Sequence, residues 1–235
     1  MQIKGWATAP AVGLAFLSCA TGSAGAEDAK PSYPSMAPLA QYQMASPADE
    51  IALARSAAPP SISGDAEILV LGAHGYETAV KGKNGFVCLV ERSWASGLDD
   101  PNFWNPKLRA PQCLNAAAAR TVLPAYLERT EWVLAGVSLS DVMARTPTDA
   151  VASREPALGA MCYMMSKQQY LSDSGAHHWH PHLMFYIAHA DAAGWGADLP
   201  DSPVDSGQGK FEPFRTFFVP IAKWSDGTSA VMEMH

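Results

Sequence analysis

The sequence predicts an α+β fold, in which an antiparallel sheet is built from hairpins and a helical block, about residues 115–146, packs on one face. Three observations lead to this prediction. Segments with strand patterns gather before and after the helical block, and turns that contain glycine join neighbouring segments. Strands and helices also do not alternate along the chain as a parallel α/β sheet requires.

The first 26 residues have the order of a secretory signal peptide, because Lys4 precedes an apolar run that ends in small residues. This run is too short to span a bilayer, and no later stretch is apolar for long enough, so no transmembrane segment is expected. The protein is therefore expected in the periplasm or secreted. A second interpretation places a lipid anchor on Cys19.

Residues 27–45 are rich in Pro, Ser and Ala and predict a linker, which leaves residues 46–235 as a single α+β domain. The chain has 16 basic and 23 acidic residues, a net charge of −7 that becomes −8 when Lys4 is removed with the signal. Phosphate binding needs clustered Lys and Arg, so nucleic acid is not expected as a partner.

In the first half, Ser46 and Pro47 predict the start of a helix that runs to about Ala57. Strands are expected at residues 67–71, 76–80 and 86–92. The last two of these are separated by Asn84-Gly85, a pair that predicts a hairpin. Residues 93–112 are rich in proline and turn formers, so they predict a long irregular loop.

Residues that cap, interrupt or end helices divide the helical block into three segments. Asn115 is expected to cap the first segment, Pro124 to kink or break the helix, and Gly136 to end the second segment. Ser138 or Ser140 is expected to cap a short third one. Four strands follow at residues 159–166, 182–188, 214–224 and 229–235, and Asp226-Gly227 predicts a hairpin between the last two.

Three cysteines remain after the signal, so at most one disulfide can form within the chain. Cys88 and Cys113 are the expected pair because the segment between them has little regular structure of its own. Loop closure of that length contributes about 3 to 4 kcal/mol. Three unpaired, buried thiols are an equally weighted alternative.

Four of the seven histidines fall within residues 177–182, in the sequence His-His-Trp-His-Pro-His. In an extended chain His178, His180 and His182 share one face, followed by Met184 and Tyr186, while Leu183, Phe185 and Ile187 face the core. Only neighbours on that face can share an ion, so His180 and His182 are the predicted metal ligands. His178 is a further candidate, and the remaining ligands are expected from among His189, His74, His177 and Glu91.

Histidine ligands without a set of thiolates favour a divalent transition metal, Zn, Cu, Ni or Fe. The main functional expectation is therefore transition-metal binding by an exported protein. A binding protein is favoured over an enzyme. Were it an enzyme, a metal-dependent hydrolase or oxidoreductase is expected, with Glu91 as a possible base. Cys162 lies in an apolar strand, where a thiol is expected to be inert.

Two alternatives stay open. The first is a metal-free binding module, in which Trp104 and Trp179 stack on a small ligand and Arg109 holds its carboxylate or phosphate. The second is a structural protein of the envelope. A solvated histidine loop without a specific role is the corresponding alternative for residues 177–182.

The segments NGFVCLVER, NPKLRAPQCLN, WHPHLMFY, WGADLPDSPV and WSDGT resemble a family of exported bacterial proteins whose function is unknown. The resemblance extends over most of the chain after the signal. It implies export and a single domain, and it implies no activity or catalytic residue.

Overall fold

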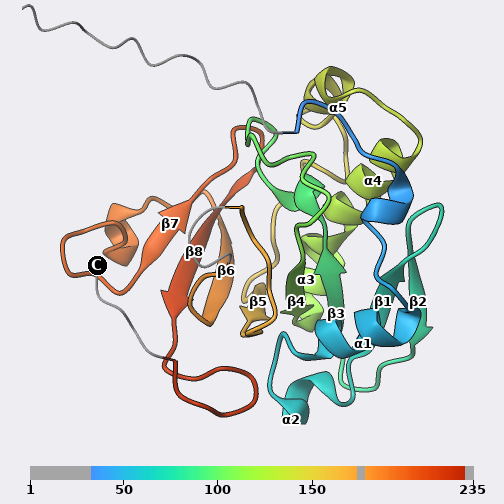
Figure 1. Cartoon of the computed structure of the whole chain (residues 1–235). Coiled ribbons are helices and arrows are strands. Elements are labelled where there is room, and N and C mark those ends of the chain that lie inside the picture. The colour runs from blue at the N-terminus through green and yellow to red at the C-terminus, as the bar shows by residue number, and fades with distance from the viewer. Residues whose placement is uncertain (1–32, 174–177, 231–235) are drawn as a thin grey trace, which may run out of the picture. The chain divides into compact units, whose positions relative to one another are not determined.

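The computed structural model describes residues 33–173 and 178–230, and all statements about elements refer to these ranges (Figure 1). Eight strands in this part form one sheet in the order β2-β1-β3-β4-β5-β6-β8-β7. The strands are β1 Glu67–Leu71, β2 Tyr76–Val80, β3 Val87–Glu91, β4 Ala110–Leu114, β5 Met161–Met164, β6 His182–Ala188, β7 Asp205–Gly207 and β8 Phe214–Pro220. The α+β class is confirmed, but the sheet is mixed.

The helices begin where the capping residues predict. Asn115 and Ser138 accept hydrogen bonds from the backbone at α3 Ala116–Thr121 and α5 Leu139–Arg145, and Ser46 does so at α1 Pro47–Arg55. Pro124 stands at the start of α4 Leu123–Leu134, and the chain leaves α4 through Gly136 at φ +77°. The remaining helical segments are α2 Pro60–Ser63, η1 Leu39–Gln41, η2 Ser93–Ala95 and η3 Ala193–Trp195. None of the described helices is long and apolar enough to cross a membrane.

The predicted hairpin around Asn84-Gly85 is wrong. β2 pairs antiparallel with β1, through a turn in which the Gly72 amide donates to the Gly75 carbonyl, and β3 lies on the other side of β1. Asn84 holds a turn of a different kind, because its amide nitrogen donates to the Ile62 carbonyl and its oxygen accepts from the Phe86 amide. The chain thereby crosses back before it enters β3, which makes β1 and β3 parallel.

The segment expected as a loop at residues 93–112 ends in a central strand. β4 pairs with β3 along its whole length, from Val87 opposite Leu114 to Glu91 opposite Ala110. Pro111 obscures this strand in the sequence, since proline is disfavoured inside a sheet.

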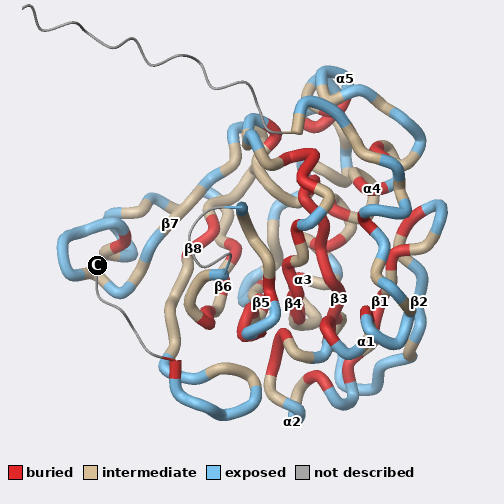
Figure 2. The backbone as a smooth tube through the Cα atoms, in the orientation of Figure 1, coloured by how far each residue is buried: buried red, intermediate tan, exposed pale blue. Residues whose placement is uncertain are grey.

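Helices cover both faces of the sheet, as Figure 1 shows. α1 packs against β1, β3 and β4 through Leu53 and Ala54, while α3, α4 and α5 pack on the opposite face through residues such as Leu123 and Val133. The helical block therefore lies on one face, as predicted, but a second layer lies on the other. Figure 2 shows buried residues concentrated in the central strands β3, β4 and β5.

Alternation along β3 divides its side chains between the two layers. Cys88 and Val90 face α1, whereas Leu89 faces the helical block. Cys88 is directly opposite Cys113 of β4, and the two form a disulfide on the α1 side. The predicted pairing is therefore confirmed.

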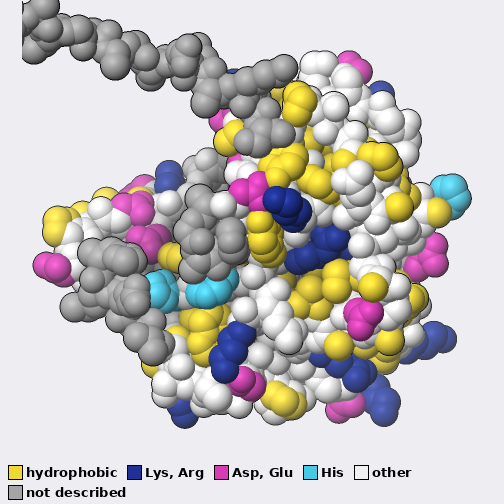
Figure 3. Space-filling model, viewed as in Figure 1, with side chains coloured by type: hydrophobic (Ala, Val, Ile, Leu, Met, Phe, Trp, Pro, Cys, Tyr) yellow, Lys and Arg dark blue, Asp and Glu magenta, His cyan; other side chains and the backbone are white. Residues whose placement is uncertain are grey.

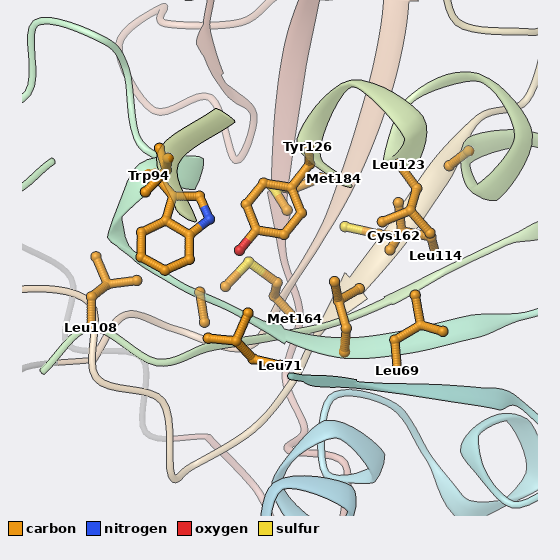
Figure 4. Packing of buried hydrophobic residues seen from close by; sticks show 14 of the residues in the cluster. Leu69, Leu71, Trp94, Leu108, Leu114, Leu123, Tyr126, Cys162, Met164 and Met184 are labelled. Carbon is orange, nitrogen blue, oxygen red and sulfur yellow. The ribbon is translucent and has the colours of Figure 1, made fainter. Parts of the chain in front are cut away.

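The pattern along β6 is the reverse of the expectation. Met184 and Tyr186 are buried in the large core beneath the helical block, while Leu183, Phe185 and Ile187 are half-buried. Met184 pairs with Cys162 of β5, so this face of β6 continues the face of β5 that belongs to the large core. The Cys162, Met164 and Met184 side chains meet Tyr126 of α4 there (Figure 4).

Part of the expected linker packs against the domain. Tyr42 is fully buried, and its hydroxyl donates to the Trp104 carbonyl at 2.9 Å.

The expected signal peptide, Cys19 and His177 lie outside the described residues, as does most of the strand expected at 229–235. Before that strand, Gly227 adopts φ +82° in the predicted turn, and Lys223 bridges to Ser229. On the face seen in Figure 3, side chains of both charges stand next to one another.

One buried ion pair and its hydrogen bonds connect the end of β3 with α1, β1, α4 and the segment that contains Tyr42. Arg92, at the end of β3, is fully buried and donates from Nη2 to Glu50 Oε1 of α1 at 2.8 Å and from Nε to the Tyr42 carbonyl at 2.6 Å. The same Glu50 oxygen accepts the Leu71 amide of β1. The backbone amide of Arg92 donates to the Tyr126 hydroxyl of α4 at 2.8 Å.

Replacing Glu50 by alanine should lower the free energy of unfolding by about 3–5 kcal/mol, because it leaves a buried guanidinium without its carboxylate. Urea unfolding measures this loss. Asp49→Ala is the matched control, since Asp49 is exposed in the same helical turn and should cost about 1 kcal/mol or less. Equal losses for the two variants would contradict the role given to the ion pair.

Candidate functional site

A cavity of about 590 Å³ lies between α4 and the face of the sheet opposite α1. Its floor comes from strands β3, β4, β6 and β8, one wall from α3 and α4, and its rim from the loops around residues 97–101 and 207–212. The lining residues that matter for its chemistry are Glu91, Gln112, Tyr126, Arg129, Tyr186 and Glu212.

Glu91 is the ionisable group on the floor. It ends β3 on the same face as Leu89, and only 8% of its surface is exposed. Burial raises the pKa of Glu91 to about 8, against the smaller, opposing effects of the Arg129 charge and of a hydrogen bond from Gln112. The carboxyl therefore holds its proton at neutral pH, where an ordinary glutamate is ionised.

Gln112 joins Glu91 to two further polar groups. Its amide nitrogen donates to Glu91 Oε2. Its amide oxygen lies 3.2 Å from the Cys162 sulfur and 3.3 Å from the Tyr186 hydroxyl oxygen. Burial raises the pKa of both the thiol and the phenol, so both keep their protons and can donate. The result is a buried chain of hydrogen bonds across β3, β4, β5 and β6.

Arg129 places a cation in the wall of the same cavity. Its Nη1 donates to the Trp94 carbonyl at 3.1 Å and more weakly to the Ser96 carbonyl at 3.4 Å. No carboxylate in the described part of the chain forms an ion pair with it, although Glu212 and Glu91 lie near enough to raise its pKa. Burial has the larger, opposite effect and lowers that pKa. Nε and Nη2 have no hydrogen-bond partner among the described residues.

The remainder of the cavity is apolar inside and acidic at its edge. Met184, Phe214 and Phe218 line it from β6 and β8. Asp99, Asp100 and Glu212 lie in the two loops at the rim, whereas Arg154 adds one positive charge there. A ligand would therefore meet apolar surface and one guanidinium inside a negatively charged entrance.

The predicted metal ligands lie outside this cavity. His182 begins β6 and is 2% exposed, with its ring 4.6 Å from that of Trp179. Its Nδ1 meets the backbone carbonyl of His180 at 2.7 Å rather than the His180 ring. Burial lowers the pKa of His182 to about 4, so its imidazole is neutral.

The other predicted histidines are dispersed. His178 is exposed, and its ring contacts that of Trp224. His189 lies beyond the far end of β6, about 23 Å from His182 by strand rise, and pairs with Glu155. Within residues 33–173 and 178–230, no group of three His, Cys, Asp or Glu side chains is arranged to hold a metal. Metal binding through His180 and His182 therefore stays a prediction without structural support.

Glu91 also does not adjoin the histidines. β4 and β5 separate its strand from that of His182, which places the two backbones about 14 Å apart. The expectation that Cys162 is inert agrees with its position, because it is fully buried and burial raises its pKa.

The residues of the alternative ligand site are used structurally. Trp104 is 8% exposed and packs edge-on against Phe103. Arg109 donates to the backbone carbonyls of Pro106, Leu108, Gln41 and Gln43, which ties the amino-terminal segment to the domain. Burial, and to a lesser extent the charge of Arg92, lowers the pKa of Arg109 to about 10. Trp179 is half-buried against His182.

Sequence reasoning found Glu91 but missed the groups that surround it. Gln112 lay in a predicted loop, and Tyr126 and Arg129 lay in the predicted helical block without an assigned role, although their spacing of three places them on one helical face. A polar residue within each of two buried strands, Glu91 and Gln112, was the available signal.

Comparison of the chain with protein-family models, curated proteins and solved structures returned no match. The site is therefore interpreted from its own geometry.

The raised pKa of Glu91 should make the protein less stable as the pH rises from about 5 to about 8. The unfolded carboxyl loses its proton near 4.5, while the folded one keeps it until about 8, so the folded state binds more protons in this window. The slope from one group is at most about 1.4 kcal/mol per pH unit. Urea unfolding of the wild type and Glu91→Gln at several pH values measures it.

The variant should be more stable relative to the wild type at pH 8 than at pH 5, because glutamine is neutral throughout. Glu77→Gln, on the exposed face of β2, controls for the change in net charge. A wild-type-minus-variant difference that does not change with pH would show that Glu91 ionises normally.

Proposed function

We propose that the protein binds a small organic monocarboxylate with an apolar body in the cavity between α4 and the sheet. The observation that carries this proposal is Arg129, a half-buried cation that faces the cavity without an ion-pair partner among the described residues. A guanidinium with two unused nitrogens presents the geometry that a carboxylate accepts.

The size and lining of the cavity support a small ligand. Pockets for small molecules usually measure about 300–1,000 Å³ and combine apolar walls with a few polar groups. The volume of about 590 Å³ falls in this range, and Met184, Phe214 and Phe218 supply apolar surface. Such a ligand would bury its hydrocarbon part against the sheet.

The charges around the entrance favour a singly charged head group. Asp99, Asp100 and Glu212 at the rim repel anions, and a dianion such as a phosphate monoester is repelled more strongly than a monocarboxylate. Glu91 does not add to this repulsion at neutral pH, since it is protonated. It can instead donate a hydrogen bond to the ligand.

This proposal belongs to the metal-free ligand-binding class, but it uses different residues from those predicted. Arg129 replaces Arg109, whose guanidinium is occupied by backbone carbonyls. The apolar surface comes from β6 and β8 rather than from tryptophans in loops.

Isothermal titration with phenylacetate, 3-phenylpropanoate, phenylpyruvate and hexanoate should detect binding to the full chain. Arg129→Met should weaken it about 10- to 100-fold, because a hydrogen bond between charged groups contributes about 1.5–3 kcal/mol. Arg55→Met, at an exposed position of α1 on the other face of the sheet, is the matched control and should bind as the wild type does.

Phenylacetamide, which is neutral, and phenyl phosphate, which is a dianion, should bind more weakly than phenylacetate. Failure of all four carboxylates to bind, or equal affinities of the wild type and Arg129→Met, would overturn the proposal.

A further inference from the structure

Hydrogen bonds define which oxygen of Glu91 carries its proton. Cys162 and Tyr186 both approach the oxygen of the Gln112 amide, which therefore turns its nitrogen toward Glu91. Glu91 Oε2 accepts from that nitrogen, so a proton on Oε2 would oppose a donor. The proton thus belongs on Oε1.

Glu91 Oε1 is the atom directed at a ligand. It has no hydrogen bond within the described residues, and it is not enclosed by protein, since the Glu91 side chain lines the cavity. The strands hold this atom in place through Gln112, whose own neighbours lie on β5 and β6. A carboxyl with one anchored and one free oxygen has the arrangement of a group that transfers a proton.

The lining restricts the chemistry that this carboxyl can serve. Among the described residues that line the cavity there is no serine, cysteine, histidine or lysine, so neither a Ser–His or Cys–His pair nor an amine nucleophile is present there. Glu91 and the cationic Arg129 are the reactive elements near the floor. One carboxyl can remove a proton from carbon and return it, provided that a nearby donor stabilises the enolate.

We infer that the cavity is an active site in which Glu91 transfers a proton to and from the carbon next to the carbonyl of a 2-oxo acid. This inference rests on the proposed function, because it needs the carboxylate of the substrate to lie on Arg129. The substrate class follows from the lining: a carboxylate for the guanidinium, an acidic carbon for Oε1, and an apolar substituent for Met184 and Phe218.

The step is balanced without a further reactant. The ionised Glu91 takes a proton from C3 of the oxo acid, and the electron pair of that bond forms the C2–C3 double bond. The pair of the carbonyl bond moves to its oxygen, whose negative charge is stabilised by the guanidinium of Arg129. Protonated Glu91 then returns the proton to C3, or to the oxygen to leave the enol.

Exchange of the C3 protons of phenylpyruvate and 4-methyl-2-oxopentanoate in D₂O, followed by proton NMR, tests the inference on the full chain. The protein should accelerate exchange over the buffer rate by roughly 10²- to 10⁴-fold. The acceleration should rise with pH with a midpoint near 8, where Glu91 becomes ionised. Glu91→Gln should abolish it, and Glu77→Gln should not.

Binding measured on the same variants separates the possible failures. If Glu91→Gln still binds phenylpyruvate and has lost the exchange, the inference is supported. If the wild type binds both oxo acids through Arg129 but exchanges neither above the buffer rate, or if Glu91→Gln exchanges as fast as the wild type, the inference is overturned and the proposed function stands. If none of the carboxylates binds, the proposed function itself is overturned.

Gln112 is a positioning residue in this scheme, because it touches Glu91 and not the substrate carbon. Its hydrogen bond lowers the pKa of Glu91. Gln112→Met should therefore move the midpoint of the exchange profile to higher pH. A slower exchange whose midpoint stays where it is in the wild type would overturn this role.

Discussion

The buried contact between Arg92 and Glu50 is the interaction on which the arrangement of the site depends. Arg92 directly follows Glu91, and its hydrogen bonds hold α1, the amino-terminal segment and α4 at the end of β3. Removing a charge pair from water is costly, and it is tolerated here because the described donors of Arg92 meet the Glu50 carboxylate and two backbone carbonyls. The position of the Tyr126 hydroxyl, which accepts the Arg92 amide and contacts Tyr76, follows from the same contact.

Glu91, the last residue of β3, and Arg92, which follows it, differ in charge state because their side chains face opposite layers. Arg92 finds a carboxylate at 2.8 Å and stays charged. Glu91 faces the cavity and finds an amide, and the guanidinium of Arg129 lies too far away to form an ion pair with it. The cost of burial then exceeds the attraction of Arg129, so the carboxyl holds its proton to about pH 8. Its protonation is a consequence of the sheet geometry that separates these two charges.

Local signals predicted local structure well. The caps at Ser46, Asn115 and Ser138 depend on one side chain and a backbone amide three residues later, and each is present. Pairing between distant strands left no such signal, which is why the parallel contact of β1 and β3 and the central strand β4 were missed. The disulfide was predicted correctly, but from the irregular character expected for the segment between the two cysteines rather than from the direct opposition of Cys88 and Cys113 in neighbouring strands.

The candidate site illustrates the same limit at the level of function. Histidines adjacent in sequence suggested a site because they are close along the chain. In the structure, however, His182 packs into an aromatic cluster at the start of β6, and His189 follows the opposite end of that strand. Glu91, Gln112 and Arg129 are distant from one another in the sequence. They line one cavity because Glu91 and Gln112 lie on the faces of their strands that are turned toward α4, which carries Arg129. Arg92 and Arg129 both donate to backbone carbonyls, but of these two only Arg92 also contacts a carboxylate among the described residues. Arg109 also has no ion pair within the described residues, but backbone carbonyls occupy its guanidinium, so the free Nε and Nη2 of Arg129 distinguish the cavity from the rest of the described polar interior.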